Sequence, residues 1–338
     1  MKIAQIVVAK ETREGEGRVA LTPSAVAALV AKNYTIVVES GAGLLAGFSD
    51  EDYLKAGARI FKFGQDKFPS QSLIVRVKRP KNARQILENE VLPPGTAMLG
   101  FLDPLDDDLS HMVSWKAQGV TPISLELLPL AGNDPRSAQA AMSRFAGRLA
   151  FQDAHARYQG SWLKRVSVFG TGPAGMSAAL AAKELELPVQ LFGRREAYRQ
   201  KVEALGIRYQ LLPSEFTLDF VRAHLREETI IIAAARSIGK RTSILIDEAT
   251  LEILPEKAIV VDLCTGEGGN VFGSKKDEVV VTNRGISIVN VSGYPKAEPT
   301  AASEAFAQCM VNLLLEIAPN GEIDWDNPLL RNVRTFFN

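Results

Sequence analysis

The segment from Arg165 to Leu180 constrains the fold of this 338-residue chain more than any other stretch. It opens with an apolar run, Val166–Phe169, and ends in alanine-rich sequence of helical character. Between the two stand Gly170, Thr171, Gly172, Pro173, Ala174 and Gly175, whose glycines have G-x-G-x-x-G spacing. This order predicts a strand, a tight turn that only glycine can make, and a helix whose free N–H groups face a phosphate. The six residues are therefore predicted to bind a dinucleotide, the alternative being a glycine-rich turn without a ligand.

Strand and helix patterns alternate along the whole chain, which predicts the α/β class. We expect two Rossmann-like domains with mainly parallel sheets and helices on both faces, joined by two long helices over Ser137–Tyr158 and Thr300–Ile317. The turn-rich stretch 129–135 is the clearest break in composition. A substrate or catalytic domain is expected over residues 1–136 plus 300–338, and a dinucleotide-binding Rossmann domain over residues 137–299. The patterns assign no element to residues 57–72 or 81–96.

Charge and composition exclude several classes of partner. Thirty-nine basic residues balance thirty-nine acidic ones, so nothing indicates nucleic acid. No run approaches the roughly 20 apolar residues of a membrane span, so we expect no direct membrane insertion and membrane contact only through another chain. The N-terminus predicts a first strand rather than a signal peptide, and two cysteines fit a reducing, cytoplasmic compartment. No cluster of His, Cys, Asp and Glu has the spacing of a metal site.

In an open α/β sheet, ligands bind beyond the carboxyl ends of the strands. In the second domain these ends carry Ala235, Asp262 and Leu263, which are predicted to contact the cofactor.

The end of the predicted strand Val189–Phe192 bears on which nucleotide binds. A site for NAD usually has an acidic residue here, which binds the ribose 2′-hydroxyl. This chain instead has Gly193, Arg194 and Arg195. Glycine leaves room for a 2′-phosphate and an arginine can bind it with two hydrogen bonds, so these residues favour NADP(H). The alternative is that both arginines are solvated and the ribose lacks an acidic partner.

Three charged residues of the first domain stand in loops or at the predicted ends of strands. Arg18 and Lys78 can bind the carboxylate of a small substrate through charge-assisted hydrogen bonds, although either alone is more often a surface charge. Asp103 follows the predicted strand Ala97–Leu102. The three histidines, His111, His155 and His224, lie on helical stretches away from strand ends, where structural or exposed roles are expected.

In these residues the chain resembles the family of alanine dehydrogenases and the nucleotide-binding N-terminal part of the NAD(P) transhydrogenase alpha subunit. The resemblance covers nearly the whole chain. Its motifs are Lys10–Arg13, Arg18–Pro23, Glu39–Gly43, Gly47–Tyr53, Ala56–Ala58, Val77–Lys78, the glycine turn, Val261–Leu263 and Gly268–Asn270. The end of the chain is closer to the transhydrogenase branch, in Val311–Leu314, Asn320–Asp324 and Arg331–Arg334.

The resemblance implies a two-domain subunit that forms a dimer or larger assembly. In alanine dehydrogenases the residues matching Arg18 and Lys78 hold the carboxylate and carbonyl of the keto acid, which makes Lys78 a candidate catalytic residue as well. The catalytic histidine of that branch falls at or near Asp103, and its aspartate partner falls at Gly266. Amino-acid dehydrogenation needs proton transfer, whereas hydride transfer between two nicotinamides needs mainly orientation. These two departures therefore favour the transhydrogenase branch.

The chain also departs from the transhydrogenase branch. That branch is implied to bind NAD(H), with an acidic residue where this chain has Gly193. Its Arg-Gln-Asp loop orients the nicotinamide, and the corresponding segment here offers Arg136 and Gln139 in a different order.

Three functions follow from these observations. The first is a nicotinamide-dinucleotide-binding subunit that transfers hydride between NAD(H) and NADP(H), the second nucleotide being held by a partner subunit. The alternative is a stand-alone NAD(P)H-dependent amino-acid dehydrogenase of the alanine type or imine reductase, in which Arg18 and Lys78 anchor the substrate and Asp103 donates a proton. The third is a non-catalytic nucleotide sensor. NADP(H) is favoured by Gly193 and Arg194, and NAD(H) by the resemblance.

Overall fold

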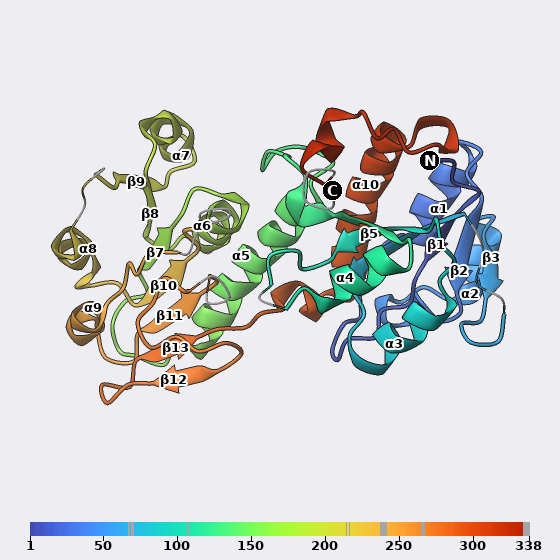
Figure 1. Ribbon diagram of the computed structural model, residues 1–338. Coiled ribbons are helices and arrows are strands. Elements are labelled where there is room, and N and C mark those ends of the chain that lie inside the picture. Colours follow the sequence, from blue (N-terminus) through green and yellow to red (C-terminus); the bar gives the residue numbers. More distant parts are fainter. Residues whose placement is uncertain are drawn as a thin grey trace. The chain divides into compact units, whose positions relative to one another are not determined.

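The computed structural model describes residues 1–66, 68, 71–106, 108–213, 215, 217–236, 242–264 and 268–333 of the chain. The chain divides into two compact units (Figure 1). Unit 1 comprises Met1–Met142 with Lys296–Asn338, and unit 2 comprises Ser143–Pro295. Each unit contains one β-sheet with its own helices.

The sheet of unit 1 is parallel throughout. Its strands are β1 (Gln5–Val8), β2 (Ile36–Glu39), β3 (Arg59–Phe61), β4 (Ser72–Lys78), β5 (Ala97–Phe101) and β6 (Thr121–Ser124). They lie in the order β3-β2-β1-β4-β5-β6, and every neighbouring pair is parallel. Because parallel strands need crossover connections, helices must cover the sheet.

The helices of unit 1 are α1 (Pro23–Val30), α2 (Asp50–Lys55), α3 (Asn82–Val91), α4 (Ser110–Ala117) and α10 (Pro299–Ile317), with short 3-10 turns η1 (Leu44–Ala46), η2 (Leu125–Leu127), η6 (Pro319–Gly321) and η7 (Pro328–Leu330). On one face of the sheet, Val7, Ile74 and Met98 pack with Met112 and Trp115 of α4. Helices α1 and α10 contact each other and cover the opposite face (Figure 1).

Side chains cap the starts of two helices of unit 1. The Thr22 side chain accepts from the Ala25 amide, and proline stands at the first position of α1. The Ser49 side chain accepts from the Asp52 amide while the Asp52 carboxylate accepts from the Ser49 amide, which makes a capping box at α2. The glycine-rich stretch before α2 is thus a structural turn that leads into a capped helix.

Two elements of unit 1, β3 and α3, lie where the sequence patterns assigned none. Strand β3 has three residues, of which only Phe61 is buried. Helix α3 turns apolar side chains outward: Ile86 is 61% exposed and Leu87 48% exposed, whereas its buried residue is Glu88. The Glu88 carboxylate accepts hydrogen bonds of 2.9 Å from Nη1 and Nη2 of Arg76 on β4. Because a buried ion pair replaces the apolar stripe, hydrophobic periodicity does not reveal this helix.

Unit 2 contains a seven-stranded sheet in the order β12-β13-β11-β10-β7-β8-β9. The strands are β7 (Val166–Phe169), β8 (Val189–Gly193), β9 (Arg208–Leu211), β10 (Ile230–Ala233), β11 (Ile259–Asp262), β12 (Val279–Val281) and β13 (Ser287–Val289). Only the edge strand β12 runs antiparallel to its neighbour among these pairs. The helices are α6 (Pro173–Glu184), α7 (Arg199–Glu203), α8 (Leu218–Leu225), α9 (Glu248–Ile253) and α5 (Ala138–Arg157), which begins in unit 1.

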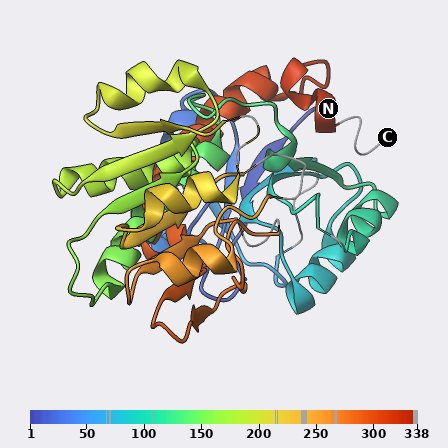
Figure 2. The same cartoon turned by 90° about the vertical axis from the view of Figure 1, so that its left-hand side faces the viewer.

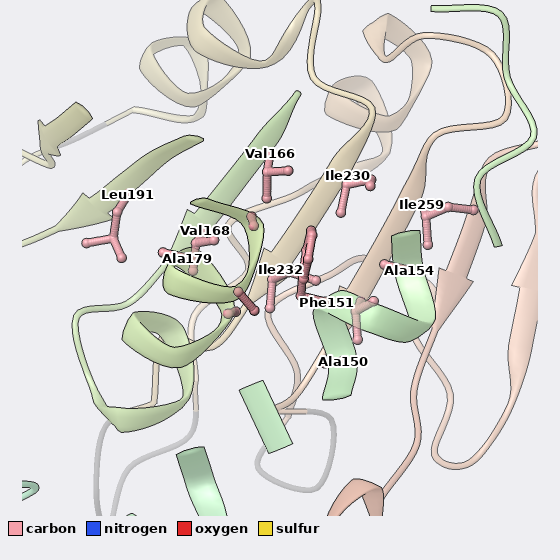
Figure 3. Packing of buried hydrophobic residues seen from close by; sticks show 14 of the residues in the cluster. Ala150, Phe151, Ala154, Val166, Val168, Ala179, Leu191, Ile230, Ile232 and Ile259 are labelled. Atoms are coloured by element: carbon pink, nitrogen blue, oxygen red, sulfur yellow. The ribbon is translucent and has the colours of Figure 1, made fainter. Parts of the chain in front are cut away.

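The sheet of unit 2 has a separate apolar core on each face. Helices lie on both sides of this sheet (Figure 2). On one face Val168, Ile232 and Val166 pack against α5 and α6 (Figure 3). On the other face the rings of Phe169 and Phe192 stack with centroids 4.4 Å apart and pack with residues of α8 and α9. The predicted α/β class, with mainly parallel sheets and helices on both faces, is confirmed.

Glycines permit the closest contacts around α6. A Cβ atom at Gly147 of α5 would overlap the carbonyl oxygen of Ala174, and one at Gly175 would overlap the carbonyl oxygen of Gly170. A Cβ at Gly172, by contrast, would meet no atom within 4 Å. The third glycine of the motif is therefore required for packing of the helix on the strand, and the second is not.

We predict that Gly175→Ala destabilises unit 2 by about 1–3 kcal/mol, because the added methyl group forces α6 away from β7. Gly172→Ala is the matched control, since its backbone at φ −73° and the open space around it accept alanine. The measurement is urea unfolding followed by circular dichroism. Equal midpoints for the two variants would contradict the packing role of Gly175.

Candidate functional site

Both sheets have the same strand order around their centre, which locates a candidate site in each unit. In unit 1 the chain moves from β1 to β2 on one side and later to β4 on the other. In unit 2 it moves likewise from β7 to β8 and later to β10. Where the strand order reverses, the loops beyond the carboxyl ends separate and leave room for a ligand. The relevant loops follow β1 and β4 in unit 1, and β7 and β10 in unit 2.

In unit 2 this position is occupied by the glycine turn. Gly170 has φ +111°, and a Cβ there would lie 2.5 Å from the carbonyl oxygen of Ala234, which follows β10. Helix α6 begins directly after Gly172. Gly172 is exposed and Thr171, Pro173 and Ala174 are partly exposed, whereas Gly175 is buried. The turn thus presents accessible backbone at a helix start, the arrangement that accepts a pyrophosphate.

The end of β8 has no room for the acidic side chain of a usual NAD site. A Cβ at Gly193 would overlap Tyr209 Oη and lie 2.6 Å from Thr171 Cγ2. Tyr209 is 3% exposed, and its hydroxyl donates to the carbonyl oxygen of Arg195 at 2.7 Å. The side chains of Arg194 and Arg195 are exposed. A buried tyrosine therefore occupies the space beside Gly193, and two cationic side chains follow it at the surface.

Asp262 was predicted to contact the cofactor, and its side chain lies in the loop that follows β11. Its carboxylate is fully buried and accepts hydrogen bonds from the amides of Cys264 at 2.8 Å, Asn270 at 3.0 Å and Val271 at 3.2 Å. Burial raises the pKa of Asp262, and the three amides oppose that shift. A carboxylate enclosed in this way holds its own loop together. Leu263, next to it, is partly exposed.

Asn270 is a residue of this loop whose role the sequence did not reveal. Its side-chain oxygen accepts from the amide of Ala235 at 3.1 Å, and its Nδ2 donates to the carbonyl oxygen of Ser243 at 2.9 Å. Asn270 thereby ties Ala235, predicted as a cofactor contact, to the loop after β11. The motif Gly268–Asn270 was the available signal. Gly266, where the family's aspartate partner falls, and Arg334 of the last motif lie outside the described residues.

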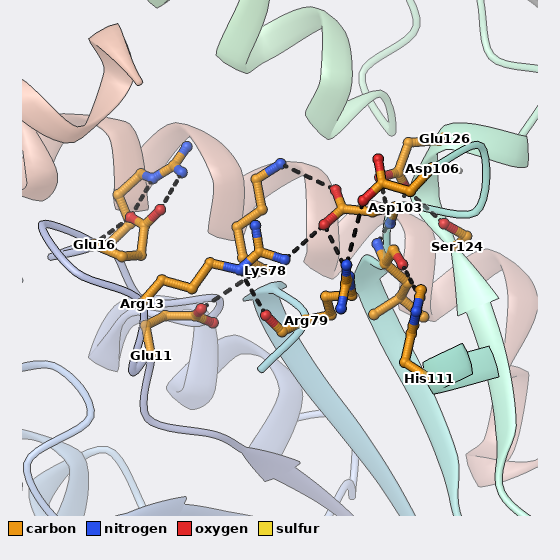
Figure 4. A network of polar contacts seen from close by, with 12 residues as sticks. Glu11, Arg13, Glu16, Lys78, Arg79, Asp103, Asp106, His111, Ser124 and Glu126 are labelled. Carbon is orange, nitrogen blue, oxygen red and sulfur yellow. Dashed lines mark hydrogen bonds and ion pairs between the residues drawn. The ribbon is translucent and has the colours of Figure 1, made fainter. Parts of the chain in front are cut away.

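In unit 1 the structure brings Lys78 and Asp103 together and adds two cations that the sequence did not single out (Figure 4). Oδ2 of Asp103 accepts from Nη2 of Arg13 at 2.6 Å and from Nε of Arg79 at 3.0 Å. Lys78 Nζ lies 3.8 Å from Oδ1 of the same carboxylate. Arg13 comes from the loop after β1, Lys78 ends β4, Arg79 follows it, and Asp103 follows β5. We call Arg13, Lys78, Arg79 and Asp103 the Asp103 cluster.

Neighbouring side chains fix the backbone of Asp103, which has φ +55°, a left-handed conformation that Asp tolerates better than most residues. The Glu126 carboxylate accepts from the amides of Leu102 at 3.3 Å and Asp103 at 3.1 Å. His111 Nε2 lies 2.9 Å from the carbonyl oxygen of Leu102, and because a carbonyl only accepts, this nitrogen carries the proton. The predicted structural role of His111 is thus consistent with its position.

Arg18 forms a pair of its own rather than joining the Asp103 cluster. Its Nε and Nη2 donate to the two carboxylate oxygens of Glu16 at 2.7 and 2.5 Å, and its Nη1 lies 3.2 Å from Met142 Sδ. Arg18 is 4% exposed and Glu16 2% exposed. Burial alone would raise the pKa of Glu16, but the hydrogen bonds from Arg18 outweigh burial and lower it, so Glu16 is ionised at neutral pH.

Glu11 holds the end of β4 from below the cluster. Its carboxylate accepts from the amides of Val77 at 2.6 Å and Lys78 at 3.2 Å. Burial raises the pKa of Glu11 to about 7, although the positive charge of Arg76 opposes the shift. Glu11 therefore fixes the backbone of Val77 and Lys78 at the end of β4.

The charges around Asp103 determine the protonation state of its carboxylate. Burial alone would raise its pKa, but Lys78 and then Arg13 and Arg79 lower it to about 2. Burial lowers the pKa of Lys78, an effect that Asp103 and Glu126 oppose. Asp103 is ionised at any physiological pH and therefore has no proton to give. The role of Asp103 as the proton donor of a dehydrogenase stays a prediction, and this charge state argues against it.

The structure does not bring Arg136 into the Asp103 cluster. Its Nε and Nη2 donate to the carboxylate of Asp134 at 2.9 and 2.8 Å, and its Nη1 lies 3.6 Å from Glu316 Oε1. Gln139, the other residue of that segment, is partly exposed at the start of α5.

Arg13, Glu16, Arg79 and Glu126 are the residues of this region that sequence reasoning missed. Arg79 follows β4 directly, Glu126 follows the edge strand β6, and Arg13 and Glu16 lie in the loop after β1. Among the described residues, no group of three or more His, Cys, Asp and Glu side chains could hold a metal ion. Within the same ranges of the chain, no helix is both long and apolar enough to cross a membrane.

We predict that Asp103 contributes about 2 kcal/mol to the stability of unit 1 at neutral pH, since its pKa falls from 3.8 to about 2 on folding. A lowered pKa stabilises the fold above the ordinary pKa, and this contribution is lost as pH falls through 3.8 towards 2. Urea unfolding should show wild type and Asp103→Asn far apart at pH 6 and converging near pH 2. Asp106→Asn, at a side chain 50% exposed, is the control with little pH-dependent difference. A gap for Asp103→Asn that stays constant with pH would contradict the assignment.

Comparison with known proteins supports one family along both units. The model of the alanine dehydrogenase/PNT N-terminal domain matches residues 7–146, and that of the C-terminal domain matches residues 152–336. The first part of NAD(P) transhydrogenase subunit alpha from Rickettsia prowazekii is 25% identical, over 97% of this chain and 94% of that protein. Alanine dehydrogenase 1 of Staphylococcus aureus is 24% identical, over 94% of this chain and 88% of that protein.

A solved structure agrees with these relatives. The transhydrogenase from Sinorhizobium meliloti superposes with a TM-score of 0.81 at 26% identity, covering 91% of this chain and 92% of that one. Both kinds of relative are oxidoreductases by name, and the resemblance that the sequence motifs suggested is confirmed. On the match of both domain models, the chain belongs to the alanine dehydrogenase/PNT family.

Proposed function

We propose that the chain is a nicotinamide-nucleotide oxidoreductase of the transhydrogenase type, which exchanges hydride between NAD(H) and NADP(H). Unit 2 binds one nucleotide, with the pyrophosphate against residues 170–175. The second nucleotide is held by a partner subunit. The transhydrogenase alpha subunits among the relatives support this assignment, as does the open backbone of Gly172 at the start of α6.

The observation that supports this choice of reaction is the contact of Asp103 with three cations, which lowers its pKa to about 2. Amino-acid dehydrogenation needs a group that gives and takes a proton at neutral pH. Asp103 stands where the resemblance places that group, and its pKa of about 2 leaves it without a proton. Hydride transfer between two nicotinamide rings moves no proton to or from the protein, so positioning suffices. The residues of this chain would then bind and orient its nucleotide and exclude water.

We propose that the nucleotide in unit 2 is NADP(H), although the resemblance favours NAD(H). Tyr209 fills the space beside Gly193, so no carboxylate stands there to repel a 2′-phosphate. The exposed Arg194 and Arg195 side chains are the cations able to bind that phosphate. The bound nucleotide would supply the hydride carrier. Ala235 and Leu263 would contact the part of the nucleotide that extends beyond the glycine turn.

We further propose a cytoplasmic protein that forms a homodimer or larger assembly and meets a membrane only through a partner subunit. The Rickettsia prowazekii relative is named as one part of an alpha subunit, which supports the existence of partner chains. The small number of cysteines in the sequence supports a reducing compartment.

A second candidate is a stand-alone amino-acid dehydrogenase or imine reductase. The observation in its favour is that Arg18 and Lys78, which resemble the keto-acid anchors of alanine dehydrogenases, both lie at the strand-order reversal of unit 1. In that reading Lys78 is catalytic. A nucleotide sensor without chemistry is the third candidate and has no structural observation of its own in its favour.

The nucleotide assignment predicts the effect of removing both surface arginines. Arg194→Ala/Arg195→Ala should weaken NADPH binding about tenfold or more, because charge-assisted hydrogen bonds to a phosphate are lost. NADH binding should stay unchanged, and this serves as the internal control. Fluorescence titration of wild type and variant with both nucleotides measures the effect. A wild-type preference for NADH, or equal losses for both nucleotides, would refute the NADP(H) assignment.

The reaction assignment predicts direct deuterium transfer. With 4-deuterated NADH and NADP⁺, the protein together with the gene products encoded beside it should yield deuterated NADPH without incorporation of solvent protons, as read by mass spectrometry. The protein alone with pyruvate, ammonium and NADH or NADPH should show no turnover. Ammonium-dependent oxidation of NADH or NADPH that Lys78→Ala abolishes would establish the dehydrogenase instead.

A further inference from the structure

Tyr209 on β9 forms a hydrogen bond to the turn that carries the exposed arginines of unit 2. Its hydroxyl donates to the carbonyl oxygen of Arg195 at 2.7 Å. The same carbonyl oxygen accepts from the amide of Tyr198 at 3.1 Å, which closes the 3-10 turn η3 (Glu196–Tyr198). Tyr209 is buried, and burial raises the pKa of its hydroxyl, so this donor keeps its proton at neutral pH. Two donors therefore hold the backbone of Arg195.

The turn that Tyr209 holds begins directly beside the glycine turn. The amide of Gly170 donates to the carbonyl oxygen of Phe192 at 2.9 Å. A Cβ at Gly193 would lie 2.6 Å from Thr171 Cγ2, so the end of β8 contacts the glycine turn. In a dinucleotide site of this fold, the ribose that carries the 2′ position lies at this strand end. The two arginines follow Gly193 directly in the chain.

A third arginine of this region, Arg199, is engaged by other partners. Its Nη2 donates to Glu196 and its Nη1 to Glu203, each at 3.1 Å. Nη1 also donates to the carbonyl oxygen of Tyr209 at 3.3 Å, and the guanidinium lies 5.3 Å from the centroid of the Tyr209 ring. Because two carboxylates already balance its charge, Arg199 supports the tyrosine and is poorly suited to bind a phosphate.

From these contacts we propose that Tyr209 is a positioning residue that determines nucleotide preference, because it fixes the turn that presents Arg194 and Arg195 to a 2′-phosphate. A hydrogen bond that exists before the nucleotide arrives reduces the ordering that binding would otherwise require. Only a nucleotide with a 2′-phosphate gains from it, since a 2′-hydroxyl carries no charge for the arginines to bind. The inference rests on the proposed binding of NADP(H) in unit 2.

The test is fluorescence titration of the full chain and its Tyr209→Phe variant with NADPH and NADH. Phenylalanine keeps the buried ring and removes only the hydroxyl, and the Arg195 carbonyl oxygen still accepts from the Tyr198 amide. Tyr209→Phe should bind NADPH about fivefold more weakly, the effect of one lost hydrogen bond, and should bind NADH as tightly as wild type. A purely structural role for Tyr209 would weaken the binding of both nucleotides alike.

Two further variants complete the test. Tyr198→Phe is the matched control, because Tyr198 belongs to the same turn and its hydroxyl makes no hydrogen bond within the part of the chain that the structure describes. Both affinities should be unchanged in it. In the Arg194→Ala/Arg195→Ala background, Tyr209→Phe should weaken NADPH binding no further, since the side chains through which it acts are absent.

The outcomes separate this inference from the nucleotide assignment. A wild type that prefers NADH refutes the NADP(H) assignment, and the inference falls with it. A wild type that prefers NADPH, together with an unchanged preference in Tyr209→Phe, refutes the inference alone. Losses of NADPH affinity that add up in the combined variant would also overturn the inference, because Tyr209 would then act independently of the two arginines.

Discussion

Carboxylates that accept backbone N–H groups hold the loops at the carboxyl ends of both sheets. Glu11 binds the end of β4, Glu126 binds the residues after β5, and Asp262 binds the loop after β11. Glu39 likewise accepts from the Lys10 amide after β1, at 2.8 Å. Loops outside a sheet have backbone donors with no strand to pair with, so an acidic side chain from a neighbouring segment supplies the acceptor. The two candidate sites share this support despite their different chemistry.

This support explains which features could be predicted from the sequence. The glycine turn was predictable because a backbone angle of +111° at Gly170 and the overlap at Gly175 dictate the residue type locally. Acidic residues at strand ends carry no such local signature. Asp262 and Asp103 look alike in the sequence, yet one accepts backbone amides and the other binds three cations. Only the three-dimensional partners separate these roles, and the same holds for α3, whose buried face is an ion pair.

The two units therefore differ in charge at equivalent positions of the same strand order. In unit 2 the reversal point is uncharged, with accessible backbone at Gly172 and exposed arginines beyond β8. In unit 1 it is densely charged, but Arg13, Lys78 and Arg79 share one carboxylate and Arg18 has its own. The first surface offers exposed backbone and cations, whereas in the second the cations contact carboxylates of the chain itself.

The buried tyrosine beside Gly193 has a consequence for how this chain can change over evolution or in the laboratory. An acidic residue at position 193 would collide with the Tyr209 ring and with Thr171. Tyr209 is itself part of the core on the α6 face of the sheet, so shrinking it alone would open a cavity. Positions 193 and 209 are thus epistatic. Either substitution by itself would disturb the packing, and only the two changes together would avoid both the overlap and the cavity. The residue type at position 193 is thus constrained by side-chain packing with Tyr209 and Thr171.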